Sequence, residues 1–246
     1  MLSEGQKKIQ NLIETKLSGN DKDEALLFHV SVERKLASVE IWFENVESML
    51  PDFVVQPGTL SGDTGVEAQN LTDDDVHSYL TRMSAYIDAF FMSGKSTLDT
   101  LAHEIRSLYD LGGHTGDLYF EAALDLIGAH HSNCSLNSYL TSLNIRSCQW
   151  YMDLSSYRRA CAHESIIQIQ PSVEVNYLTG ESKEVLLKLP TDPAQRPLAY
   201  DRKNFVSTGR EIRDNLRKLI TESYDKVLDD IKRGTTKIVY DNELVS

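Results

Sequence analysis

One apolar stripe limits what this chain can fold into more than any other feature. Between positions 76 and 108 apolar residues recur at steps of three and four, the period of one face of an α-helix. The stripe consists of Val76, Leu80, Met83, Ile87, Phe91, Gly94, Leu98, Leu101, Ile105 and Leu108. An unbroken helix of this length extends for roughly 50 Å. Thr72 and the aspartates at 73–75 supply a cap and favourable charges for its start. We therefore predict a long central helix that ends at Gly112-Gly113.

Similar stripes predict further helices along the chain. The same spacing covers residues 32–50, which Pro51 closes, and then 136–161 and 212–231, with a shorter helix around 117–127. The 136–161 stripe is Leu136, Leu140, Leu143, Ser147, Trp150, Leu154, Tyr157 and Cys161. We expect one continuous helix there. Gly234 is placed to end the last helix.

Between residues 165 and 189 the apolar period changes from about 3.6 to two. Ile167, Ile169, Val173 and Val175 alternate with polar residues, and the pattern resumes at 185–189 after a Thr-Gly turn. This pattern favours a small antiparallel hairpin or a three-stranded ribbon. The sequence thus predicts a mainly α fold, an antiparallel helical bundle with a small β-hairpin excursion before the last long helix.

The chain's length suits one generous domain, which we predict over residues 1–246. Residues 51–70, with two prolines and several glycines, are expected to form a loop insertion, and residues 235–246 a C-terminal tail. No internal repeat or low-complexity segment is evident.

Charge and cysteine usage limit the partners and the compartment. The formal net charge is −12 and the sequence pI is about 5.0, which opposes non-specific adhesion to nucleic acid or to anionic membranes. Any polyanion site must therefore be local. The three cysteines, Cys134, Cys148 and Cys161, are odd in number and lie at no CxxC spacing. With no apolar run of about 20 residues, we expect a cytoplasmic protein without a membrane partner.

Plausible chemistry stands out at residues 155–164, SSYRRACAHE, where the 136–161 helix is predicted to end. Arg158 offers a permanent planar cation that suits phosphate, and His163 offers a proton donor or acceptor near neutral pH. Cleaving RNA without a metal requires deprotonating a 2′-hydroxyl, stabilising the charge on phosphorus and protonating the leaving oxygen. His163 could transfer the protons, and Arg158 could hold the phosphate with help from Tyr157 or Arg159. The alternative is that the arginines complement the helix dipole and that His163 is a capping residue.

The order of helix, loop and hairpin, together with Tyr-Arg-Arg-x3-His, resembles the HEPN superfamily over roughly residues 25–233. The resemblance implies an antiparallel helical bundle with an Arg-x4-to-6-His element between its last two long helices. Many such proteins are metal-independent ribonucleases or toxins that work as dimers, and others have no known activity. By this resemblance Arg158 and His163 correspond to the motif residues. Arg159 departs from the pattern, because the family prefers a small polar residue at that position.

The last predicted helix carries a second basic feature. Arg210, Arg213 and Arg217 lie at steps of three and four, and could join the end of the 136–161 helix in a groove for a polyanion. The alternative is a solvated face balanced by neighbouring acids.

Two other patterns give weaker indications of a functional site. Two histidines, His130 and His131, lie near Cys134 but meet no standard zinc spacing, so we expect no metal and no cofactor. The segment Ser93–Thr97, SGKST, looks like the tail of a phosphate-binding loop. It lies inside a helical stripe instead of after a strand, which argues against an ATP site.

Two functions remain open from the sequence. The first is a HEPN-like, metal-independent endoribonuclease of toxin or defence type, acting through Arg158 and His163 with Tyr157, Arg159 and the three arginines of the last helix as substrate-binding residues. The second is a non-catalytic HEPN-like module for dimerisation, nucleotide binding or protein interaction. Both predict a homodimer, an RNA or nucleotide ligand, and an antitoxin-type protein as a further candidate partner.

Overall fold

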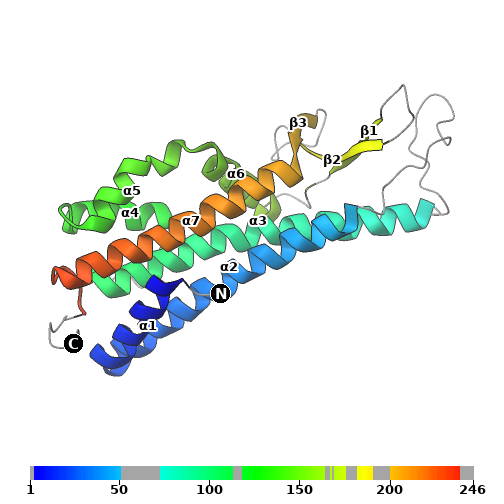
Figure 1. Cartoon of the computed structure of the whole chain (residues 1–246). Helices are drawn as coiled ribbons and strands as arrows, with labels where there is room; N and C mark the ends of the chain where they lie inside the picture. The colour runs from blue at the N-terminus through cyan, green and yellow to red at the C-terminus, as the bar shows by residue number, and fades with distance from the viewer. Residues whose placement is uncertain are drawn as a thin grey trace. The chain divides into compact units, whose positions relative to one another are not determined.

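The computed structural model describes residues 3–50, 73–112, 118–163, 167, 169–175, 182–190 and 200–238. The loop predicted at 51–70 and residues 239–246 of the predicted tail lie outside this part of the chain. The described helices are α1 (Glu4–Lys16), α2 (Gly19–Met49), α3 (Asp73–Tyr109), α4 (Phe120–His130), α5 (Ser135–Leu143), α6 (Gln149–His163) and α7 (Phe205–Lys232) (Figure 1). Among these residues, no helix is long and apolar enough to cross a membrane.

A small antiparallel sheet precedes the last helix. Its strands are β1 (Gln170–Val175), β2 (Ser182–Pro190) and β3 (Tyr200–Asn204), in the order β1-β2-β3. The described turn into α7 is fixed by the Asn204 side chain, whose oxygen accepts hydrogen bonds from the backbone N–H of Leu187 at 3.1 Å and of Val206 at 3.3 Å. The predicted mainly α fold with a small antiparallel sheet before the last helix is confirmed.

The continuous helix expected over 136–161 is wrong, because the chain breaks it between α5 and α6. Asn144 ends α5 in the left-handed conformation, with φ of 44°. A 3₁₀ turn at Ile145–Ser147 follows before α6 begins. Asn tolerates the left-handed conformation better than most residues, so a single Asn can end a helix whose apolar spacing continues beyond it.

The first helix is an element that the sequence reasoning missed. The Ser3 hydroxyl accepts a hydrogen bond from Gln6 N–H at 3.2 Å, and the Gln6 side chain accepts one from Ser3 N–H at 2.8 Å. This reciprocal capping box starts α1. Two buried isoleucines four residues apart, Ile9 and Ile13, form its apolar face. Both signals are present in the sequence, although polar residues surround them.

The chain forms two compact units that share helices α2, α3, α6 and α7. The first unit comprises Met1–Ala37, Gly94–Tyr151 and Asp214–Ser246, and the second comprises Ser38–Ser93 and Met152–Arg213. The single domain predicted over residues 1–246 stays a prediction.

The first unit has an aliphatic core with one polar network inside it. α3 and α7 bury Leu98, Leu101, Ile105, Leu216 and Ile220, each at most 2% exposed. Asp230 of α7 lies at the start of α5, where its carboxylate accepts hydrogen bonds from the N–H groups of Ser135 at 2.7 Å and Leu136 at 2.9 Å. The Tyr109 hydroxyl donates to the same carboxylate at 2.7 Å. This aspartate satisfies two backbone donors that the first turn of α5 cannot satisfy itself.

The second unit has an aromatic core. Phe43 of α2, Phe90 and Phe91 of α3, and Phe205 of α7 are all fully buried, and their ring centroids lie 5.3–6.0 Å apart. Gly209 lets α7 approach α2 closely, because a Cβ atom there would lie 2.9 Å from Cε2 of Phe43. Tyr157 of α6 adds its ring to this core against Phe91. The aromatic core therefore holds the end of α6 that carries the Arg-x4-His pair.

Candidate functional site

Tyr157 fixes the end of α6 to the rest of the second unit. Its side chain is 3% exposed, and its ring stacks on Phe91 with 4.7 Å between centroids. Its hydroxyl donates a hydrogen bond to the carbonyl of Pro190 in β2 at 2.9 Å. The residue predicted to assist substrate binding thus lies in the core, where it positions the neighbouring Arg158.

Asp88 of α3 ties the chain beyond α6 back to this unit. Its carboxylate accepts a hydrogen bond from the Ile167 N–H at 3.0 Å, and the Cys161 thiol lies 3.4 Å away. Burial raises the pKa of Asp88 despite these bonds. Burial and the nearby carboxylate raise the pKa of Cys161, so the thiol stays protonated at neutral pH and makes a poor nucleophile.

Arg158 and Arg159 keep their positive charge available to a ligand. Arg158 is half-buried and Arg159 is exposed. Within the described residues, neither has an acidic partner at ion-pair distance. Both precede the end of α6, where the helix dipole favours cations. The second half of the helix therefore carries two guanidinium groups that can contact a phosphate.

His163 is the last residue of α6, so the helix does not end between the two motif positions. Successive residues of an α-helix are rotated by about 100°, and positions 158 and 163 therefore lie about 140° apart around the axis. Arg159 and His163 are four positions apart and share a face. One chain does not bring Arg158 and His163 to the same face of this helix.

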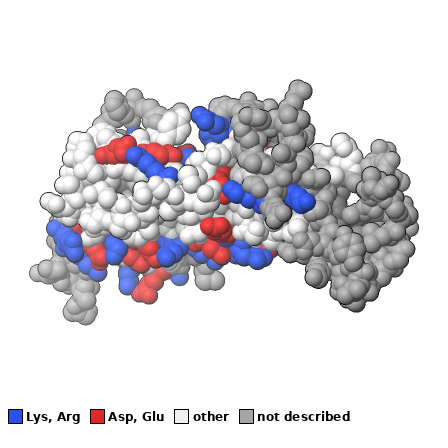
Figure 2. Space-filling model, turned by 90° about the horizontal axis from the view of Figure 1, so that it is seen from above, with Lys and Arg blue, Asp and Glu red and all other residues white. Residues whose placement is uncertain are grey.

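Two of the three arginines predicted on the last helix lie beside acids of α2. Arg210 pairs with Glu47 at 2.7 Å. Arg213 lies 4.0 Å from Glu40 and 4.7 Å from the centre of the Phe43 ring. Arg217 is exposed further along α7 and takes part in an interaction of its own. The two arginines in the second unit therefore contribute little net charge to a polyanion groove. On the face of the molecule that Figure 2 shows, basic and acidic side chains of the described residues are likewise interspersed.

The lysine of the SGKST segment is also neutralised within the protein. Lys95 is 7% exposed inside helix α3. Its ammonium group lies 2.9 Å from the Glu121 carboxylate and 3.3 Å from Asp99. The Tyr151 hydroxyl also donates to Glu121. This lysine therefore belongs to a buried ion network and leaves no free charge for nucleotide phosphates.

Of the residues considered for zinc, His131 and Cys134 interact with backbone groups, and His130 is exposed. A ring nitrogen of His131 lies 2.8 Å from the Tyr109 carbonyl oxygen. Cys134 caps α5 by accepting from the Asn137 N–H, and burial raises the pKa of its thiol to about 11. Across the described part of the chain, no group of three or more His, Cys, Asp or Glu side chains is arranged to hold a metal ion.

A buried acid–base network in the first unit escaped the sequence reasoning. Glu104 is fully buried in α3, its carboxylate 2.7 Å from Nδ1 of His29, and it accepts a hydrogen bond from the Tyr224 hydroxyl at 2.6 Å. The second ring nitrogen of His29 has no partner among the described residues. An acid at position 104, three residues after Leu101 and four before Leu108 and so on the same face as the apolar stripe, was the available signal. Because the three groups are enclosed, they support the core and do not face solvent.

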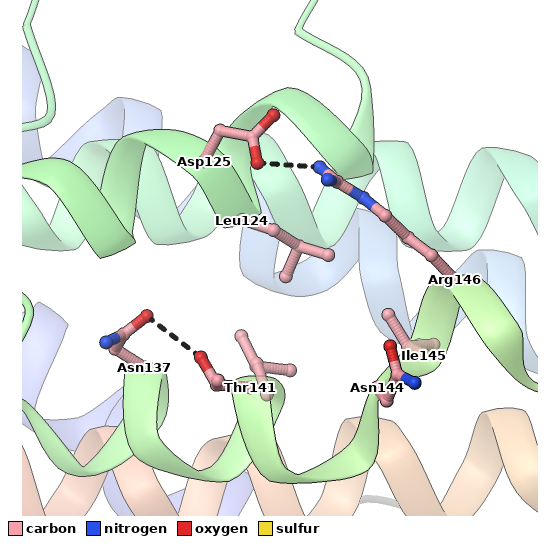
Figure 3. Close-up of a pocket in the computed structure, with 8 residues that line it drawn as sticks. Leu124, Asp125, Asn137, Thr141, Asn144, Ile145 and Arg146 are labelled. Atoms are coloured by element: carbon pink, nitrogen blue, oxygen red, sulfur yellow. Dashed lines mark hydrogen bonds and ion pairs between the residues drawn. The ribbon is translucent and has the colours of Figure 1, made fainter.

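A pocket of about 200 Å³ lies between α4 and α5 in the first unit (Figure 3). Leu124 and the buried Ile145 contribute apolar surface, and Asn137 and Thr141 contribute polar groups. Its one cation, Arg146, already donates to the Asp125 carboxylate at 2.7 Å and to the Glu121 carbonyl at 2.8 Å. The pocket is therefore close to neutral and offers less to an anion than the end of α6.

Comparison with protein-family models, with curated proteins and with solved structures finds no match for this chain.

Proposed function

We propose that this chain is a HEPN-like RNA-binding protein that holds phosphate groups with Arg158 and Arg159 at the end of α6. The proposal rests on one contrast within the second unit. Arg210 and Arg213 lie beside acids of α2, whereas Arg158 and Arg159 have no acidic partner among the described residues. Guanidinium groups that are not neutralised bind phosphate by charge-assisted, often bidentate, hydrogen bonds.

A local site agrees with the acidic chain. A net charge of −12 weakens long-range attraction to RNA, so affinity must come from contacts at short distance. Such contacts release counterions, and each phosphate contact to a single strand contributes about 0.7 to the slope of log K against log salt concentration. Two arginines therefore account for a slope of about 1.4.

Binding is tested by fluorescence anisotropy with a short labelled single-stranded RNA at several salt concentrations. We expect Arg158→Gln with Arg159→Gln to weaken binding and to reduce the salt slope by about 1.4. Arg82→Gln is the matched control, since Arg82 is an exposed arginine of α3 in the same unit. Because the control removes one charge and the double variant two, a control loss of binding free energy at least half as large as that of the double variant would assign the effect to overall charge and would exclude the α6 site.

Metal-independent cleavage is the finer part of the proposal, and it requires two copies of the chain. His163 supplies proton transfer and Arg158 stabilises the charge on the phosphorane-like transition state. Because the two positions lie about 140° apart on one helix, the complete site takes Arg158 from one copy and His163 from the other. A shared site of this kind requires the homodimer that the sequence analysis predicts.

Subunit mixing tests the shared site directly. In EDTA, Arg158→Ala and His163→Ala should each abolish cleavage of a mixed RNA pool. Mixing the two variants should then restore about a quarter of the wild-type activity, because half of the dimers are mixed and each has one intact site of two. Recovery requires that dimers containing one chain of each variant form, and co-expression of the two variants allows this. If wild type cleaves and the co-expressed variants stay inactive, the shared site is wrong.

The second candidate is a HEPN-like binding module without catalysis. The separation of positions 158 and 163 on one continuous helix and the presence of Arg159 favour it. Salt-dependent RNA binding by wild type, together with no cleavage at any protein concentration, selects this function. Robust cleavage in EDTA that depends on His163 excludes it.

A further inference from the structure

A polar groove in the first unit lies between α5 and the last turns of α7. It has a volume of about 460 Å³. It is lined from α5 by Ser135, Ser138, Tyr139 and Ser142, and from the α7 side by Lys226, Asp229 and Arg233. We name these seven residues with the hollow between them the α5–α7 groove. Its volume falls in the range of about 300–1,000 Å³ that small-molecule sites occupy.

The two cations of the groove are not neutralised by the part of the protein that the structure describes. Lys226 and Arg233 are seven positions apart, so they lie on one side of α7. Among the described residues, neither cation has an acidic partner within 4.0 Å. The carboxylate of Asp229, which lies between them in the sequence, is also farther than this from both charged groups. Elsewhere on α7, Arg210 is paired with Glu47. The cations that face the groove are thus available to a ligand.

The α5 side of the groove carries hydroxyl groups and no charge. Residues 126–145 contain no Asp, Glu, Lys or Arg. The Ser138 hydroxyl donates to the Cys134 carbonyl at 3.0 Å, and the Ser142 hydroxyl donates to the Tyr139 carbonyl at 2.7 Å. Since their protons are engaged, both serine oxygens are left as acceptors. The α5 wall therefore suits a ligand that brings its own hydroxyl donors.

Nearby acids add little negative charge to the groove. Asp230 accepts hydrogen bonds from two backbone N–H groups of α5 and from the Tyr109 hydroxyl, which compensates its charge. Glu222 lies 4.0 Å from Lys218 and beside Tyr139. Burial and this carboxylate raise the pKa of Tyr139, which stays a neutral hydroxyl. Two cations and one free carboxylate, that of Asp229, then set the charge of the groove.

We propose that the α5–α7 groove binds a small phosphate ester that carries hydroxyl groups. Lys226 and Arg233 hold the phosphate, since both donate charge-assisted hydrogen bonds to its oxygens. The Asp229 carboxylate and the oxygens of Ser138 and Ser142 accept from the hydroxyl groups of the ligand. The site lies in the first unit and does not depend on the RNA-binding proposal for the end of α6.

Isothermal titration calorimetry of the full chain tests the groove with three probes: inorganic phosphate, ribose 5-phosphate and a short RNA without a terminal phosphate. We expect ribose 5-phosphate to bind more tightly than inorganic phosphate. Lys226→Gln and Arg233→Gln should each weaken it about tenfold or more, because each removes a hydrogen bond between charged groups. Lys232→Gln is the matched control, since Lys232 is an exposed neighbour of Arg233 outside the groove and should leave binding unchanged.

Asp229→Asn distinguishes the contribution of the ligand's phosphate group from that of its hydroxyl groups. Removing a negative charge next to the phosphate should strengthen binding of inorganic phosphate. Removing a carboxylate acceptor should weaken binding of ribose 5-phosphate. Three results would overturn the proposal. They are weaker binding of both inorganic phosphate and ribose 5-phosphate by Asp229→Asn, a loss of affinity in Lys232→Gln equal to that in Lys226→Gln, and no binding of ribose 5-phosphate to wild type at millimolar concentration. RNA binding that Lys226→Gln abolishes, without binding of ribose 5-phosphate, would assign the groove to a nucleic-acid phosphate instead. Arg158→Gln should leave the groove unaffected.

Discussion

The same substitution, glycine to alanine, should have opposite effects at two helical positions of this chain. Gly128 lies in α4, and a Cβ atom there would meet only the Asn137 side-chain oxygen, at an ordinary 3.5 Å. Gly209 lies in α7, and a Cβ atom there would lie 2.9 Å and 3.1 Å from ring carbons of Phe43 and 3.2 Å from Phe205. The two sites therefore share the change in helix propensity and differ in packing.

The magnitudes decide the sign at each site. Replacing a helical glycine by alanine stabilises by about 0.8–1.0 kcal/mol. At Gly128 nothing opposes this gain. At Gly209 the added methyl group overpacks two fully buried rings, which costs about 1–3 kcal/mol. We expect Gly128→Ala to raise the free energy of unfolding by about 0.5–1 kcal/mol and Gly209→Ala to lower it by about 1 kcal/mol.

Urea denaturation followed by circular dichroism measures both variants against wild type. A change of 1 kcal/mol moves the melting temperature of a chain of this size by about 2–4 °C, which makes thermal unfolding a second readout. Equal stabilisation of the two variants would refute the tight packing of Phe43 and Phe205 around Gly209, since these ring contacts distinguish the two sites.

Two buried networks give further predictions. Glu104→Gln keeps the shape of the side chain but turns an amide donor toward either His29 or Tyr224, and we expect urea denaturation to show a loss of about 1–3 kcal/mol; a loss below about 0.5 kcal/mol would contradict the network. At Glu121 burial raises the pKa, but the hydrogen bonds from Tyr151 and Lys95 outweigh it and lower the pKa below its ordinary 4.5. This carboxylate therefore stabilises the fold above about pH 4.5, and the contribution is lost as pH falls through the lowered folded value. Because the Glu121 side chain is 36% exposed and solvent screens its pairing, Glu121→Gln should lower the free energy of unfolding by only about 1–2 kcal/mol at pH 7. If the difference in this free energy between the variant and wild type does not become smaller below pH 4.5, the ion network is excluded.

Apolar periodicity predicted the long helices because it reports directly on buried faces. The 76–108 stripe corresponds to α3, and the 212–231 stripe lies within α7, which begins seven residues earlier at Phe205. The same signal failed at Asn144, where the stripe continues through a break made by one backbone conformation. Periodicity carries no information on a single left-handed residue, so the division into α5 and α6 required the structure.

Ion pairing explains why the candidate site could be predicted only in part. Spacing along the chain identified Arg158 and Arg210 equally well as cations on helical faces. What separates them is a carboxylate far away in sequence, since Glu47 lies beside Arg210 but not beside Arg158. A contact between residues 163 positions apart leaves no trace in local sequence. Charge that is available to a ligand is therefore a property of the fold, although the charge itself is visible in the sequence.

The helical geometry of α6 also separates binding from cleavage through their dependence on concentration. Arg158 and Arg159 belong to one chain, so the proposed contacts with RNA should form in a monomer, and we expect the binding per chain to be independent of protein concentration. In the proposed mechanism, cleavage needs Arg158 of one copy and His163 of another, so activity per chain should rise in proportion to concentration below the dissociation constant of the dimer and level off above it. Measuring cleavage in EDTA over a dilution series, with light scattering on the same samples, checks this relation. Activity per chain that stays constant while the protein becomes monomeric would show that one chain completes the site, and the division of Arg158 and His163 between two copies would then be wrong.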